Sequence, residues 1–176
     1  MSVQAITRIG NPTLRERSTE IEVHEFGSEW LLNLVQDLWD TQAHYGSVGI
    51  AASQIGVNRR IFVFGFESTE RYKNVVPVPR TVLCNPIIKI TDPTTTNRYE
   101  GCLSLDNLRG EVARPIGIEY SGFDAYGNPI KRTVTNFHAR LVQHETDHLD
   151  GVVFLDRVQD IKTIGFREEL NKVGIF

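Results

Sequence analysis

The sequence predicts an α+β fold in which antiparallel β-sheets pack around a central helix, with further helices near both ends of the chain. Three observations lead to this prediction. An amphipathic segment at Gln143–Leu149 contains H-E-x-x-H, and runs of alternating or continuous apolar residues come before it. Strands and helices do not alternate in the regular β-α-β order that a parallel sheet requires, which favours antiparallel sheets.

The composition is that of an ordinary globular protein. The chain has 176 residues, of which 40% are hydrophobic and 23% are charged. It is therefore long enough to form one domain over residues 1–176 with a core of its own. The net charge of -3 provides no basic field of the kind that attracts nucleic acid. We expect no sequence-specific nucleic-acid binding, and we expect a monomer.

Three further features point to the cytoplasm. No apolar run approaches the roughly 20 residues that a membrane-spanning helix needs, and the first residues lack the apolar segment of a secretory signal. Cys84 and Cys102 are the only cysteines, too few for a disulfide framework. We therefore expect a cytoplasmic protein without membrane contact, and an inert buried thiol at Cys84.

The N-terminal region predicts an irregular arm and then a helix. Residues 3–23 contain Gly-Asn-Pro and mixed charges, which break any long period. A helix from about Ser28 to Tyr45 follows, and Gly46 can end it. The apolar stripe of this helix consists of Trp30, Leu31, Leu34, Val35, Leu38 and Trp39.

Later segments predict strands, turns and a last helix. Runs of β-branched and aromatic residues predict strands at 60–66, 81–90, 116–120 and 130–134. A polar excursion at 67–80 and a turn at 92–97 interrupt these strands. An amphipathic segment near Ile161–Val173 predicts a C-terminal helix.

Residues 47–57 are small or apolar and include one amide, that of Gln54. Small residues allow the backbone to approach another backbone, or a ligand, closely. The segment by itself leaves two interpretations open. It is either a tight packing loop with Gln54 exposed, or a loop that lies beside a ligand.

The H-E-x-x-H segment predicts a metal site on a helix. Phe137, Leu141, His144 and His148 follow a spacing of three and four residues, so they share one face. Both imidazoles can then bind one ion, and Glu145 beside them is a candidate proton carrier. The alternative is a chance occurrence of the pattern on a solvated helix.

A catalytic metal site usually has three protein ligands and one open position. No histidine comes after His148, and the carboxylates available downstream include Asp150, Asp156 and Asp160. Upstream, Cys102 is the distinctive candidate, because a thiolate is a strong ligand for Fe(II), Zn or Ni and Gly101 leaves the backbone free to bend. The alternative for Cys102 is a small buried hydrophobic side chain.

Three segments resemble the signature motifs of the peptide deformylase family. The first family pattern is G-x-G-φ-A-A-x-Q, with φ an apolar residue, and it is matched at 47–54. The second, E-G-C-L-S, lies at 100–104, and the third, Q-H-E-x-D-H-L-x-G, lies at 143–151. The segment 108–115 also resembles the family sequence downstream of the second motif. The occurrence of these three motifs in this order is highly specific for the family.

This resemblance implies a metal-dependent hydrolase that removes the formyl group from the N-formylmethionine of nascent polypeptides, with a transient ribosome contact. The metal would be Fe(II), replaceable by Ni, Co or Zn, and its ligands Cys102, His144 and His148. Glu145 would be the general base and acid, and Gln54 with the N–H of Leu103 would hold the oxyanion. A metal that lowers the pKa of water from 15.7 toward about 7 suits such hydrolysis.

The resemblance also implies substrate contacts. The residues that would line the methionine pocket or bind the peptide are Val48, Gly49, Arg109, Phe137 and Leu141. Arg140 falls on the same wall, and we expect its stem to pack there while its charge reaches solvent. Arg114 is expected to pair with Asp147. The alternative for each arginine is a solvated surface charge.

Four residues depart from the family pattern, namely Ser47, Ser53, Asp106 and Thr146. None is a ligand, the base or an oxyanion donor, so we expect catalysis to persist while rate and substrate preference change. Two other hypotheses stay open. One is a metalloprotease that cuts internal peptide bonds, suggested by H-E-x-x-H alone, and the other is a non-catalytic deformylase-like domain that binds the ribosome or another partner.

Overall fold

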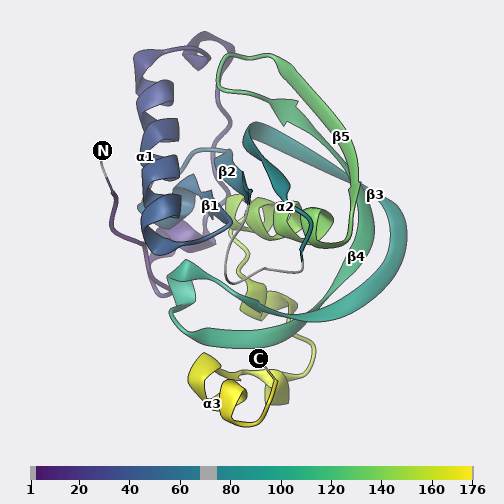
Figure 1. Cartoon of the computed structure of the whole chain (residues 1–176). Coiled ribbons are helices and arrows are strands. Elements are labelled where there is room, and N and C mark those ends of the chain that lie inside the picture. The colour runs from purple at the N-terminus through teal and green to yellow at the C-terminus, as the bar shows by residue number, and fades with distance from the viewer. Residues whose placement is uncertain (1–2, 68–74, 176) are drawn as a thin grey trace.

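The computed structural model describes residues 3–67 and 75–175 and shows helices packed on an antiparallel sheet (Figure 1). The strand order is β1-β2-β3-β4-β5, and β6 pairs with β4. The strands are β1 (Gly49–Ala51), β2 (Ile61–Phe66), β3 (Val78–Gly101), β4 (Leu108–Phe123), β5 (Pro129–Thr135) and β6 (Gly165–Phe166). The helices are α1 (Glu29–Tyr45), α2 (Asn136–Leu149) and α3 (Arg167–Lys172). The predicted α+β class is confirmed.

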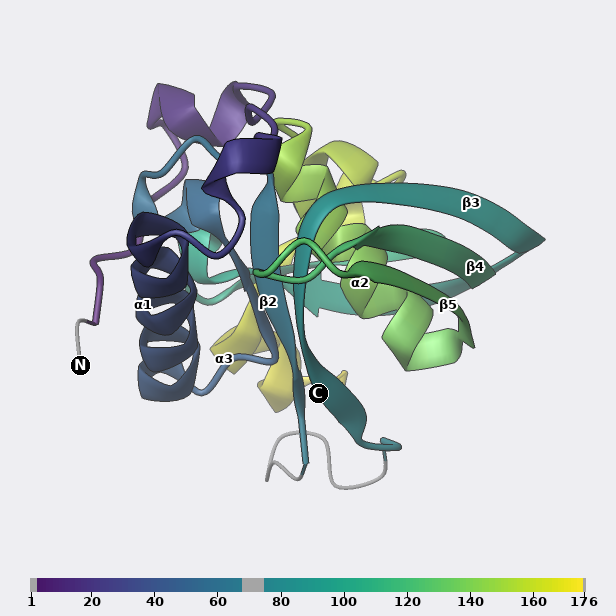
Figure 2. The same cartoon turned by 90° about the horizontal axis from the view of Figure 1, so that it is seen from above.

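Strand β2 separates two apolar clusters. Figure 2 shows α1 and α2 on opposite sides of this strand. Phe62 and Phe64 pack in the cluster under α2, whereas Ile61 and Val63 pack in the cluster under α1. Successive side chains of a strand point to opposite faces, so a strand covered on both faces must be apolar throughout. This requirement explains the continuous apolar run of β2.

Helix α1 begins and ends within one residue of its predicted bounds. The hydroxyl of Ser28 accepts from the N–H of Leu31 at 3.2 Å, and Gly46 ends the helix with a φ of 60°. The predicted apolar stripe is wrong at Trp30, whose side chain is 45% exposed. The Arg59 guanidinium covers this ring at 5.2 Å from its centroid, so an exposed indole is shielded by a cation.

The predicted turn at 92–97 is wrong, because β3 runs through it. Asp92 pairs with Gly117 and Thr95 with Pro115, with shifts of register between these pairs. β4 offers a partner along this length, so residues that favour turns form irregularities within a strand instead. Of the predicted polar excursion at 67–80, residues 68–74 lie outside the described part of the chain, and Val78 already belongs to β3.

The predicted C-terminal helix is shorter than expected. A 3-10 turn at Ile161–Thr163 and the short strand β6 occupy the first half of the predicted range, and α3 covers only Arg167–Lys172. β6 pairs with Leu108 and Arg109 of β4, which gives this backbone a partner other than its own helix. No helix in the described part of the chain is long and apolar enough to cross a membrane.

Candidate active site

Helix α2 places two histidines one turn apart, as their spacing predicted. The ring centroids of His144 and His148 are 5.1 Å apart. The helix begins at Asn136 and ends at Leu149, and Gly151 follows with a φ of 72°. A Cβ at Gly151 would lie 2.5 Å from the carbonyl oxygen of Arg15. Only a glycine therefore lets the backbone pass this close to Arg15 as it leaves the helix.

Cys102 joins the two histidines from the end of β3. One ligand atom from each of Cys102, His144 and His148 lies within 4.8 Å of the others. The Sγ of Cys102 is 3.2 Å from the Nε2 of His148. Asp150 and Asp156, which were open as third ligands, bind Arg60 and Arg15 instead. The structure therefore selects the cysteine from among the candidates that the sequence left open.

These three side chains fit a divalent metal ion. The Nδ1 of His144 lies 2.9 Å from the Oε2 of Glu100, which leaves the Nε2 of His144 for a metal. Burial of Cys102 acts to raise the pKa of its thiol, but His148 and His144 hold that pKa well below its usual value. A thiolate with two imidazoles is a donor set typical of transition-metal sites.

Glu145 lies beside this group and is 3% exposed. Its Oε2 has no hydrogen-bond partner among the described residues, and burial raises the pKa of the carboxyl to about 7. The backbone of β1 lies directly against it, because a Cβ at Gly49 would be 2.4 Å from the Oε1 of Glu145. Only a glycine at position 49 leaves room for the carboxyl in this place.

Gln54 is buried, so the interpretation of residues 47–57 as a packing loop with Gln54 exposed is wrong, and the interpretation as a loop beside a ligand stays a prediction. Its Oε1 accepts from the N–H of Ala51 at 2.9 Å, and its Nε2 lies 3.1 Å from the Sγ of Cys102. Leu103 begins the 3-10 helix Leu103–Leu105, so its N–H is not used within that helix. Cys102 thus has a side-chain amide and a peptide N–H for neighbours.

Glu100 has a central part in the site that sequence reasoning missed. Arg114 donates to its carboxylate through Nε at 2.7 Å and Nη2 at 2.9 Å, and Arg140 donates through Nη1 at 2.6 Å. His144 shares the same carboxylate. Arg114 also reaches Asp147 at 2.8 Å, so that predicted ion pair is confirmed. One buried carboxylate therefore orients a metal ligand and joins β3, β4 and α2.

The prediction that the charge of Arg140 reaches solvent is wrong. The residue is 9% exposed, and its guanidinium also donates to the carbonyl oxygens of Val112 at 3.0 Å and Thr96 at 2.5 Å. The physical reason is Glu100, a buried acceptor that draws the side chain toward β3 and β4. The only sequence signal was the glutamate next to Gly101 in the second motif.

The predicted substrate residues lie on several elements of the structure. Three of them, Val48, Phe137 and Leu141, belong to the cluster under α2. Arg109 is buried over Gly101 and donates to the carbonyl oxygens of Asp106 and Leu108 at 3.2 and 2.7 Å. Gly49 is the residue that contacts Glu145. The substrate roles of all five stay predictions.

Each residue that departs from the family pattern has a bonding partner of its own. Asp106 forms an ion pair with Arg8 and has a φ of 48°. The hydroxyls of Thr146, Ser53 and Ser47 donate to backbone carbonyls, those of Val142, His148 and Gly49 respectively. These side chains therefore leave the convergent group of Cys102, His144 and His148 intact.

A family model described as polypeptide deformylase matches residues 3–163. The chain belongs to the polypeptide deformylase family. Peptide deformylase 2 of Pseudomonas putida is 41% identical over 168 residues, which cover 96% of this chain and 94% of that protein. Peptide deformylase 1 of Bordetella pertussis is 42% identical over 168 residues, with the same shares covered. The resemblance inferred from three motifs is confirmed, and the chain is an enzyme of this family.

Solved deformylases share the fold. The Met-Ala-Ser-bound class I type b peptide deformylase of Acinetobacter baumannii has a TM-score of 0.86 at 30% identity, covering 90% of this chain and 100% of that one. The peptide deformylase of Thermotoga maritima has a TM-score of 0.78 at 31% identity, covering 91% and 100%. Deformylases from distant organisms therefore have the arrangement of helices and strands described above.

Proposed function

We propose that this enzyme hydrolyses the formamide of N-formylmethionine at the start of nascent polypeptides and releases formate, acting as a single domain in the cytoplasm. The proposal rests on the convergence of Cys102, His144 and His148 beside the buried carboxyl of Glu145. The Met-Ala-Ser bound to the deformylase from A. baumannii supports a peptide that begins with methionine. A transient ribosome contact and a monomeric state belong to the same proposal.

Cys102, His144 and His148 would hold Fe(II), which Ni, Co or Zn can replace. A divalent metal in this position supplies a Lewis acid and lowers the pKa of water toward about 7. The thiolate of Cys102 also makes the enzyme sensitive to oxygen, because a thiolate is the form of cysteine that oxidises.

Glu145 carries the proton in this proposal. Its Oε2 lacks a hydrogen-bond partner among the described residues, and its pKa of about 7 is close to the pH at which it must both accept and donate. The carboxylate takes a proton from the attacking water and delivers it to the nitrogen of the leaving amine. Formate and a free α-amine result.

Gln54 and Leu103 stabilise the oxyanion that forms on the formyl oxygen. The Gln54 amide is held by Ala51 and faces Cys102, and the Leu103 N–H adjoins the same ligand. A rigid donor is worth more than water here because it does not have to reorient as charge develops. Losing one such donor typically costs about 2.7–4 kcal/mol in the transition state.

Substrate selection follows from the surroundings of this group. The cluster under α2 offers an apolar surface, in which Val48, Phe137 and Leu141 would contact the methionine side chain. Gly49 and Arg109 would contact the peptide backbone. The close approach of β1 to Glu145 favours a small group such as formyl at the reacting position.

Formate release from N-formyl-Met-Ala-Ser by the anaerobically purified, metal-loaded enzyme tests the proposal. We expect Glu145→Gln to retain the metal and to lose at least a hundredfold in kcat. Glu168→Gln, an exposed carboxyl on α3, is the matched control and should keep full activity. Retained turnover in Glu145→Gln would contradict the role of this residue, and cleavage within an unformylated peptide would favour a metalloprotease.

A further inference from the structure

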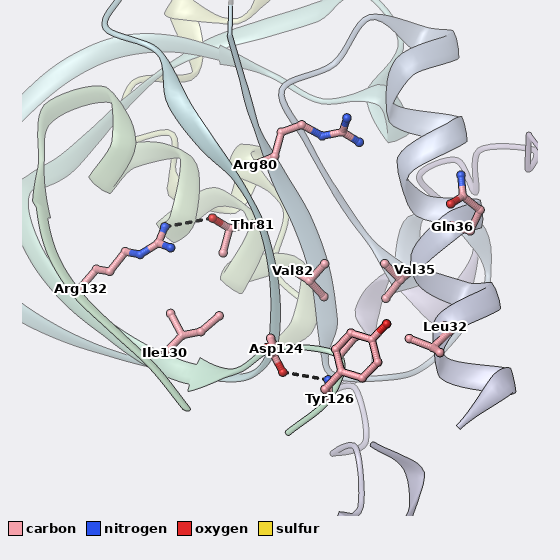
Figure 3. Close-up of a pocket in the computed structure, with 11 residues that line it drawn as sticks. Leu32, Val35, Gln36, Arg80, Thr81, Val82, Asp124, Tyr126, Ile130 and Arg132 are labelled. Atoms are coloured by element: carbon pink, nitrogen blue, oxygen red, sulfur yellow. Dashed lines mark hydrogen bonds between the residues drawn. The ribbon is translucent and has the colours of Figure 1, made fainter. Parts of the chain in front are cut away.

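A groove of about 460 Å3 lies between α1, the start of β3 and the region of β5 (Figure 3). It contains none of the metal-binding or proposed substrate residues. Its walls mix apolar and polar side chains and come from α1, the sheet and the turn between β4 and β5, with Val35, Val82 and Ile130 among the apolar ones. Tyr126, 67% exposed, stands at one end of it (Figure 3). A concave, partly apolar surface of this size can accommodate a few residues of a peptide.

The start of β3 presents a strand edge to this groove. Residues 78–83 pair with β2, whereas the register with β4 begins only at Cys84, which pairs with Phe123. β4 ends at Phe123, and the chain turns there toward β5. Within the described residues, this part of β3 is therefore paired on one side alone. An unpaired edge offers backbone N–H and C=O groups to an added strand.

Two exposed arginines flank the groove. The Arg80 guanidinium lies 4.1 Å from the centroid of the Trp39 ring, and Arg132 donates to the hydroxyls of Thr81 at 3.0 Å and Tyr120 at 3.4 Å. Neither guanidinium has a carboxylate partner within the described part of the chain. Both cations therefore keep donors for an acidic ligand.

Asp124 also lines the groove, but it does not neutralise these arginines. Its carboxylate accepts from the backbone N–H groups of Tyr126 and Asn128 at 2.8 and 2.9 Å and from the side chain of Asn128 at 2.8 Å. Burial acts to raise the pKa of Asp124, but these bonds hold that pKa below its usual value. The carboxylate stays charged but is held in the turn, and with two arginines against one carboxylate the groove keeps an excess of positive charge.

We propose that the groove binds an extended acidic segment of a partner protein, which adds a strand to the edge of β3. Pro79 has no N–H, so the pairing runs from Arg80 toward Leu83. Side chains of an added strand alternate between two faces. Val82 lies on the face of β3 that packs under α1, so apolar side chains of the partner on that face contact Val35 and Val82. Its carboxylates on the opposite face bind Arg132 beside Thr81, and a carboxylate at the end of the segment binds Arg80.

Charge argues against a second copy of this chain as the occupant. Two β3 edges related by a two-fold axis would pair the same short stretch with itself, so each copy would present its own Arg80 and Arg132, and no excess of carboxylates, to the other. Like charges across a strand pair are destabilising. Complementary charge therefore selects an acidic partner for the same backbone edge.

The test uses the full, metal-loaded, 15N-labelled chain and an acetylated hexapeptide that alternates glutamate with valine. We expect saturable shifts in the amide signals of residues 78–83 and 130–132, and unchanged signals around His144. A matched peptide that alternates lysine with valine should cause no such shifts. Arg80→Glu should weaken binding of the acidic peptide about tenfold, since it replaces an attraction by a repulsion.

Two controls make the result decisive. Lys89→Glu also reverses an exposed charge of β3 but lies outside the groove, so it should leave the peptide affinity unchanged. The Arg80 guanidinium lies over the Trp39 ring, and the residue is exposed and far from the metal-binding residues in the sequence, so Arg80→Glu should fold and keep full deformylation. Three results would overturn the proposal: equal binding of the lysine peptide, unchanged affinity in Arg80→Glu, or no shift of the amide signals at millimolar peptide. The charged edge of β3 would then serve only to prevent aggregation. Dimerisation through the same residues would overturn the proposal in favour of a second copy.

Discussion

Helix α2 contributes to two adjacent groups of buried charge that differ in how completely they are bonded. Around Glu100, both carboxylate oxygens accept charge-assisted hydrogen bonds. Around Glu145, the Oε2 of that residue and the Nδ1 of His148 lack a partner among the described residues. Buried polar atoms are nearly always paired. We infer that the group around Glu100 maintains the structure, whereas the group around Glu145 keeps atoms available for the proposed chemistry at a cost in stability.

Removing Glu100 should have the largest effect on stability. Glu100→Ala removes the one carboxylate that Arg114 and Arg140 share, and Arg140 then has only backbone carbonyls and a threonine hydroxyl as acceptors. We expect a loss of about 3–5 kcal/mol in the free energy of unfolding. The metal affinity should fall about 10–100-fold, because His144 loses the group that orients it. Urea unfolding and competition with a chelator measure the two effects.

Glu119→Ala is the matched control for Glu100→Ala. It removes a carboxylate whose partner Lys131 is 67% exposed, and such pairs contribute at most about 1 kcal/mol. A similar loss of stability in both variants would mean that the bonded group around Glu100 has no special structural role.

A methyl group at Gly49 should displace the carboxyl of Glu145 and leave the hydrogen bonds around Glu100 unchanged. Gly49→Ala places a Cβ 2.4 Å from the Oε1 of Glu145, so the carboxyl must move. We expect kcat to fall about 100-fold, the loss typical of a displacement near 1 Å. The shorter acid in Gly49→Ala/Glu145→Asp relieves the clash, so its loss should be smaller than the sum of the two single losses. Strict additivity would contradict this explanation.

Arg140→Leu should have a smaller effect, confined to stability. Glu100 keeps Arg114 and His144, but the carbonyls of Val112 and Thr96 lose a charged donor. We expect a loss of about 2 kcal/mol in urea unfolding, with kcat changed no more than a few-fold. If Arg140→Leu lowered kcat strongly and left the free energy of unfolding unchanged, the separation of a structural group around Glu100 from a chemical group around Glu145 would be wrong.

The smallest expected effect is the contribution of His138 to the pH dependence of stability. Burial lowers the pKa of this imidazole to about 4, with a further contribution from the charge of Arg132. The unfolded chain binds this proton more readily, so the stability due to neutral His138 is complete above pH 6.5 and is lost as pH falls toward 4. His138→Gln should remove about 1 kcal/mol of the difference in unfolding free energy between pH 7 and pH 5, after allowance for partial exposure.

The local parts of the site could be predicted from sequence. The spacing of His144 and His148 is a property of one helix, and helical periodicity is visible in any window. Gln54 and Cys102 were found because each lies in a short motif. Glu100 was missed although it lies in the same motif as Cys102, because its partners Arg114, Arg140 and His144 are 14, 40 and 44 residues away.

The errors in the fold have the same origin. Asp-Pro-Thr at 92–94 favours a turn by local preference, but β4 pairs with this stretch from a distant part of the chain. Trp30 fits the apolar period of α1, yet it is not part of the cluster under that helix, and its ring lies against Arg59 instead. In each case a contact between distant residues overrides a local preference.

The distance along the chain between the ligands also affects how the enzyme is made. Cys102 and His148 are 46 residues apart, and β4, β5 and most of α2 lie between them. During synthesis the cysteine emerges first, and the ligand set is incomplete until residue 148 has been added. A growing copy of this chain therefore cannot assemble its metal centre for most of the time it spends on the ribosome. Under the proposed function, a growing copy therefore cannot remove a formyl group from its own first residue during this time.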